Sequence, residues 1–204
     1  MFLPTMNLIE VRREFLKDCP IVHRKGEYLL KDLKHSSLPH GDEKIDKFFD
    51  YVSKQKNNWI IRCEINRRHS ALTFCAYYYS NKGLVAINSL HNDSVLIYHT
   101  SHFLQRMNER LNLNLTTPKE ILMAFLKEFE AYNGQKLEMI SPWIFKLFSA
   151  TNKGICLGTH DTNLKFTKMN TFITHEMLRG DQISLAQRLS IVLEKYKADA
   201  SNLA

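Results

Sequence analysis

The stretch WIIRCEINRRHSALTFCAYYY, residues 59–79, decides the fold class of this chain of 204 residues. Trp59 to Ile65 and Leu72 to Tyr79 are rich in β-branched and aromatic residues, with a polar turn between them. Two shorter apolar runs follow after turn-forming residues, at 84–87 and 95–98. The pattern predicts an antiparallel meander of four strands.

Two helices are expected before this meander. Apolar spacing after Asn7 indicates a helix that ends before Pro20, and residues 20–41 look mixed and basic. Asp42 is then expected to open a second helix, because the apolar residues after it follow helical spacing: Ile45, Phe48, Phe49 and Val52.

After the meander, the sequence predicts both helices and strands. Thr117, with Pro118 and Glu120, predicts a capped helix that ends near Asn133 and Gly134. Two closing strands and a last helix are expected at residues 154–158, at residues 166–174 and from about Ser184. The state of residues 143–148 stays open.

We therefore expect an α+β fold, an antiparallel sheet with helices packed mainly on one face. The helices at His102 and Thr117 should share that face. Residues 1–41 are expected to form an N-terminal helical extension to a domain of residues 42–204.

Composition points to a basic globular protein. Lys and Arg number 28 against 21 Asp and Glu, a net charge of +7, which favours polyanionic partners such as RNA or DNA. The four cysteines form no C-x-x-C pair and suggest buried thiols in a reducing cytoplasm. No apolar run approaches the length of a membrane span, so no membrane partner is expected.

Residues 102–110, HFLQRMNER, carry the candidate site. On a helix His102, Arg106 and Glu109 fall within a narrow arc with Arg110 at its edge, and the apolar residues lie on the other side. Cations four residues apart repel mildly, so this face suits a phosphate, although a solvated charged face is the commoner outcome.

The same residues suit RNA cleavage. Thr100 or Ser101 is a natural N-cap, which places His102 in the first turn. A neutral imidazole is a competent general base, and arginine binds phosphate oxygens bidentately. A base beside two guanidiniums is the minimum set for metal-independent cleavage through the 2′-hydroxyl.

The pattern His-x-x-x-Arg-Met-x-Glu-Arg at residues 102–110 resembles toxin-like proteins of the barnase–EndoU–colicin–RelE ribonuclease group. Similar members carry this helix before a short sheet with a late threonine-containing strand, which Thr171 to Thr174 resembles. The resemblance covers roughly residues 95–178. It implies a ribonuclease-like fold, no metal or other cofactor, a toxin or effector role and a possible inhibitory protein partner. Leu111 to Leu113 stand where a glycine-containing turn is expected.

Other residues complete the hypothesis. His175 is a candidate acid for the leaving group, and the alternative is a solvent-exposed histidine without a catalytic role. Nucleic-acid contacts are predicted at four further residues, for which turn solvation or core packing is the alternative: Arg67, Arg68, Tyr78 and Lys168.

Two other classes of function remain open. A metal enzyme would use side chains near the strand–helix junction and the closing strands, namely His99, His102, His160, Asp161, His175 and Glu176. A non-catalytic module that binds nucleic acid or a partner needs only the charge and the fold, and it is the strongest rival.

Overall fold

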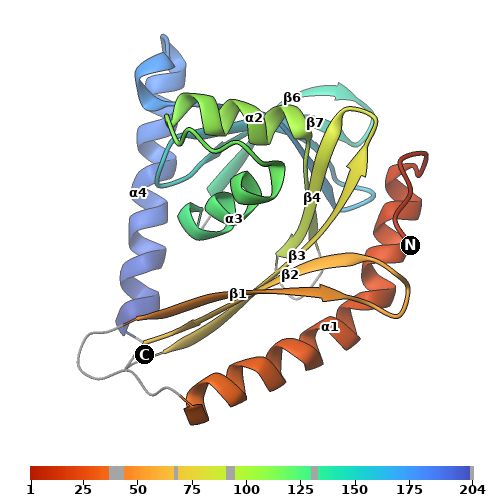
Figure 1. The fold of residues 1–204 in the computed structure, drawn as a ribbon. Coiled ribbons are helices and arrows are strands. Elements are labelled where there is room, and N and C mark those ends of the chain that lie inside the picture. The colour runs from red at the N-terminus through yellow and green to blue at the C-terminus, as the bar shows by residue number, and fades with distance from the viewer. Residues whose placement is uncertain (37–43, 67–68, 91–94, 130–132, 203–204) are drawn as a thin grey trace.

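The computed structural model describes residues 1–36, 44–66, 69–90, 95–129 and 133–202, which form an α+β fold around a nine-stranded sheet (Figure 1). The strands are β1 (Ile45–Val52), β2 (Asn58–Ile65), β3 (Ser70–Ser80), β4 (Gly83–Leu90), β5 (Val95–His99), β6 (Asn133–Ser141), β7 (Ile144–Ala150), β8 (Ile155–Asp161) and β9 (Phe166–Ile173). The helices are α1 (Leu8–Ser36), α2 (Ser101–Arg110), α3 (Pro118–Glu128), the short 3-10 helix η1 (His175–Met177) and α4 (Asp181–Asn202). None of the helices in these ranges is long and apolar enough to cross a membrane.

Two antiparallel meanders meet at one parallel pair. The sheet order is β1-β2-β3-β4-β5-β9-β8-β7-β6, and the predicted meander is confirmed as β2 to β5. β5 pairs with β9 in parallel, from Leu96 opposite Phe166 to His99 opposite Met169. The chain between them builds α2, α3 and the second meander, so β9 returns to the centre of the sheet.

Helices cover both faces of the sheet. Trp59 and Ile61 on β2 pack in one core cluster with Phe15 of α1, whereas Ile60 between them packs in another with Phe103 of α2. α3 shares the second cluster, so the prediction that α2 and α3 lie on one face is confirmed. The expectation that helices lie mainly on that face is corrected, because α1 covers the opposite face along β2 and β3.

α4 covers the other half of the α1 face. Its Leu185 and Leu189 pack with Ile155 and, at the margin, Ile173. Phe172, next to Ile173 on β9, packs instead with α2 and α3. Because neighbouring residues on a strand point to opposite faces, α4 lies on the side of the sheet that α1 occupies.

The first helix does not end before Pro20, as the sequence suggested, but continues to Ser36. Pro20 costs one backbone hydrogen bond, and burial on both sides of it outweighs that loss, since Phe15 and Val22 are both fully buried. Gly26 lets α1 pack closely on the sheet, because a Cβ at this position would lie 2.5 Å from the ring of Phe74 on β3. The predicted helical extension is therefore packed onto the sheet; its boundary at residue 41 lies outside the described residues.

The helix predicted after Asp42 is wrong, because residues 45–52 form the edge strand β1. It pairs with β2 over its whole length, from Ile45 opposite Ile65 to Val52 opposite Asn58. Over eight residues, the apolar pattern of an amphipathic helix and that of a strand with apolar residues on both faces look alike. Pairing with β2 makes this segment a strand.

The second meander was only partly foreseen. β8 and β9 occupy the predicted closing positions, and the open segment after Trp143 is β7. β6 was missed, since α3 ends at Glu128 and Asn133 begins a strand instead of ending a helix. Its register against β7 shifts twice, between Lys136 and Met139 and again before Ser141.

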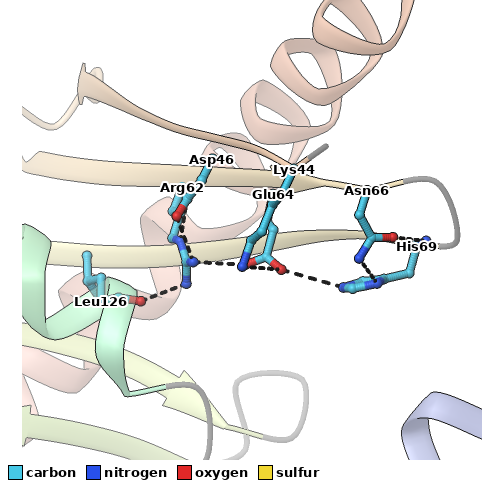
Figure 2. A network of polar contacts seen from close by, with 7 residues as sticks. All are labelled: Lys44, Asp46, Arg62, Glu64, Asn66, His69 and Leu126. Carbon is cyan, nitrogen blue, oxygen red and sulfur yellow. Dashed lines mark hydrogen bonds and ion pairs between the residues drawn. The ribbon is translucent and has the colours of Figure 1, made fainter. Parts of the chain in front are cut away.

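An ion-pair network ties the edge of the first meander to α3 (Figure 2). The buried Arg62 on β2 contacts Asp46 on β1 through Nε and Nη2, at 2.7 and 3.0 Å, and Nη2 also lies 2.8 Å from Glu64. Its Nη1 donates to the carbonyl oxygen of Leu126 on α3 at 2.8 Å. Burial alone raises the pKa of Asp46, but hydrogen bonds and charge from Arg62 outweigh it, and the pKa lies below its usual value.

Arg62→Ala should lower the free energy of unfolding by about 3 to 5 kcal/mol, because it leaves two carboxylates and a helix carbonyl without their shared donor. Urea denaturation measures the change. The matched control is Lys119→Ala, which breaks the exposed Lys119–Asp50 pair of 2.7 Å and should cost less than about 1 kcal/mol. Equal losses in the two variants would show that the network carries no special stability.

Candidate nucleic-acid interface

The predicted site helix, α2, is fixed to β9 at its N-cap residue. Thr100 caps it, since the Thr100 hydroxyl accepts from the Phe103 amide at 3.1 Å. The same oxygen lies 3.1 Å from the Met169 carbonyl oxygen on β9. Phe103 and Met107 are fully buried beneath the helix. The helix is therefore held from below, and its other edge faces outward.

That outward edge carries His102, Arg106 and Glu109. His102 is exposed, and Arg106 donates to Glu109 Oε2 at 2.8 Å. The side chains of this pair are 43% and 56% exposed. The predicted cationic face is thus partly neutralised, because the i,i+3 spacing lets Glu109 reach back to Arg106. A phosphate would have to replace Glu109 as the partner of Arg106.

Arg110 was predicted to bind phosphate with Arg106, but the structure gives it another partner. Its Nη1 donates to the carbonyl oxygen of Phe172 on β9. Arg110 therefore holds the last turn of α2 to the sheet, much as Thr100 holds the first. The long side chain reaches back to β9 because α2 runs directly over that strand.

The late strand does not complete the predicted site. Thr171 lies between Asn170 and Phe172, and since Phe172 faces α2, Thr171 faces the opposite side of the sheet. Thr174 precedes η1 and makes no side-chain capping hydrogen bond there. His175 lines a groove with Ile183 and Ile191 of α4, on that opposite side as well.

Of the predicted nucleic-acid contacts, the two that the structure describes, Tyr78 and Lys168, do not form one surface with α2. Tyr78 is only 7% exposed, and its ring stacks on Phe2 at 5.6 Å between centroids. Lys168 alternates with the fully buried Met169 of the α2 face, so it also points to the α1 face. Arg67 and Arg68 lie outside the described residues.

The metal-enzyme alternative finds no ligand set in the described ranges, where no three His, Cys, Asp or Glu side chains come together. His160 on β8 instead contacts the hydroxyl of Thr167, with 2.8 Å between Nδ1 and Oγ1. Burial lowers the pKa of His160, and Lys136 lowers it further.

His99, at the end of β5, is a core residue. Its ring lies 4.4 Å from that of Phe125 and 5.2 Å from that of Phe103, and its Nε2 donates to Asn88 Oδ1 at 3.0 Å. Burial lowers the pKa of His99 to about 3. The imidazole is therefore neutral at physiological pH and serves the packing beneath α2 and α3.

Stability should fall as pH drops below about 6.5, because the unfolded chain then protonates His99 while the folded chain does not. The expected slope is about 1.4 kcal/mol per pH unit from this residue, or about 2 kcal/mol by pH 5. His99→Gln keeps a donor for Asn88 but does not titrate, so urea denaturation at pH 7 and pH 5 should show that much less loss in the variant. Parallel losses in both proteins would contradict a buried neutral His99.

No family model, no curated protein and no solved structure matches this chain. The resemblance to the ribonuclease group consequently depends on residues 102–110 and on the late strand alone. Of those residues, the described structure keeps His102, Arg106 and Glu109 together on one exposed edge.

Proposed function

We propose that this protein acts on RNA through the exposed edge of α2, as a metal-independent ribonuclease. One observation carries the proposal: α2 is fixed to β9 through Thr100 and Arg110, while His102 and Arg106 stand outward one turn apart. A rigid support beneath outward catalytic groups is what an active site requires. The net charge of +7 favours RNA as the polyanion that meets this edge.

The proposed chemistry uses two side chains of α2. His102 removes the proton from a 2′-hydroxyl, whose oxygen attacks the adjacent phosphorus. Arg106 exchanges Glu109 for the phosphate and stabilises the charge that develops on its oxygens. A 2′,3′-cyclic phosphate forms, the bond to the 5′-oxygen breaks, and that oxygen takes a proton from water.

The second candidate is a non-catalytic module that binds RNA at the same edge. It is favoured by the position of Thr171 on the opposite face and by the groove that His175 shares with α4. Both place the expected partners of His102 away from α2. A cytoplasmic location and an inhibitory protein partner belong to the same proposal, the former supported by the burial of all four cysteines.

Purified protein should cleave total RNA in the presence of EDTA, and His102→Gln should abolish cleavage while RNA affinity stays within about twofold. His175→Gln is the matched control, since it removes another exposed histidine and should leave cleavage unchanged. Electrophoresis of the RNA reports both. RNA that stays intact at high protein concentration would leave the binding module as the function, and cleavage that needs added zinc would favour a metal enzyme.

Arg106 and Glu109 should have opposite effects on RNA affinity. Arg106→Gln should weaken binding of a 2′-O-methylated RNA, which cannot be cleaved, by about two- to fivefold. Glu109→Gln should strengthen it by a similar factor, because it frees Arg106 and removes a negative charge. Fluorescence anisotropy measures both. Weaker binding in both variants would mean that the pair acts structurally and does not contact phosphate.

A further inference from the structure

The outer side of α1 carries a line of basic residues, here called the basic ridge: Arg13, Lys17, Arg24 and Lys31, all exposed. At 3.6 residues per turn they fall within about 40° of one another around the helix axis. From first to last they span about 27 Å at 1.5 Å per residue. Figure 1 shows α1 alone on its side of β1 to β3, so none of the helices and strands that the structure describes lies over this line.

The basic ridge keeps its charge in the described structure. Within the described ranges none of its four cations makes an ion pair or hydrogen bond, although Lys17 is close enough to lower the pKa of Glu14. Glu14 itself binds the N-terminal amine, and Glu10 accepts from the Asn7 amide. Glu27 and Asp32 flank the line on opposite margins. A row of four cations is left facing solvent.

The construction of α1 favours a polyanion over a membrane as the partner of this row. Helices that lie on a bilayer bury their apolar side in lipid. The apolar side of α1 is instead buried against the sheet, through Val11, Phe15, Val22 and Leu33. What remains outward is charge, which attracts a chain of phosphates.

The position of α1 also argues against duplex recognition. A helix that reads the major groove must sink about 8.5 Å into a groove about 12 Å wide. α1 packs one side against β2 and β3, so the sheet would meet the duplex before the helix reached the bases. A shallow contact along one strand is the geometry that fits.

Tyr28 supplies the second element of such a contact. It lies between Arg24 and Lys31 along the helix, about 60° or less from each ridge cation, and is 60% exposed. Cations that follow a backbone, together with an aromatic ring on which an unpaired base stacks, are the combination found in proteins that bind single strands.

We infer that the basic ridge with Tyr28 binds single-stranded nucleic acid. The ridge binds phosphates, and Tyr28 stacks on one base. This site goes beyond the proposed function, because it lies on the opposite face of the sheet from α2. It stands whether or not α2 cleaves RNA.

The test uses a fluorescein-labelled deoxyoligonucleotide of about 16 nucleotides, single-stranded or annealed to its complement. DNA has no 2′-hydroxyl, so the chemistry proposed for His102 cannot interfere. Neutralising the ridge with Arg13→Gln, Lys17→Gln, Arg24→Gln and Lys31→Gln should weaken single-strand binding at least about tenfold. The slope of log affinity against log salt should become shallower by about 3, as expected for four phosphate contacts.

The charge-matched control removes four exposed lysines elsewhere, at Lys82, Lys127, Lys165 and Lys195, each changed to Gln. It should retain most of the affinity, although the net charge changes equally. A variant with Arg13→Lys and Arg24→Lys should also bind. Circular dichroism on each variant separates lost binding from lost folding, because the ridge residues are exposed and their loss should leave the helix content unchanged.

Tyr28→Leu tests the stacking step. It should weaken single-strand binding by about fivefold or more and leave duplex binding unchanged. The control is Tyr79→Leu, which removes a tyrosine on β3 that is 56% exposed.

Three results would overturn the inference: equal affinity for duplex and single strand, equal losses in the ridge and control variants, or ridge-dependent binding to phosphatidylserine vesicles without binding to the oligonucleotide. The absence of RNA cleavage would refute only the catalytic role of α2.

Discussion

The buried guanidinium of Arg62 is the constraint on which one half of the fold depends. It is buried, with buried apolar residues on both sides of it in β2, so it must find acceptors inside the protein. Asp46 supplies them from the edge strand, Glu64 from its own strand, and Leu126 from the end of α3. A change of register by one residue would turn Arg62 to the other face and leave it among the apolar residues beneath α1. The network thus specifies which way the sheet faces as much as it holds β1 and α3 in place.

Polar contacts also fix α2, here through hydrogen bonds instead of ion pairs. Thr100 and Arg110 both reach backbone carbonyl groups of β9, one at each end of the helix. Because the Arg110 side chain is hydrogen-bonded to β9, it does not join Arg106 at the outer surface of the helix. The sequence pattern shows which residues share an edge of the helix, but whether a polar side chain turns outward or back to the sheet depends on a strand far along the chain.

Local signals predicted much of the fold. The strands from β2 to β5, the capping box at Thr117 and the closing strands all have short-range signals in the sequence, and each appears where expected. The local signal at Pro20 gave a wrong end for the first helix, because tertiary packing keeps the helix intact beyond this residue. Ending the helix there also concealed that Arg24 and Lys31 continue the arc of Arg13 and Lys17. At the candidate site, the exposure of His102 follows from helix geometry, whereas the face of Thr171 depends on the register of β9.

The parallel pairing of β5 with β9 has a consequence for the order of folding. Thr100 and Met169, which meet where the pairing of these two strands ends, are 69 residues apart in the chain. Contacts between residues far apart in the chain slow folding, because the chain loses entropy in closing the loop before the contact energy is gained. On the ribosome the first meander and α1 emerge long before β9, so β5 is left as an unpaired edge during synthesis. Until the last strand docks, the nascent chain exposes a row of free backbone donors and acceptors at what becomes the middle of the finished sheet.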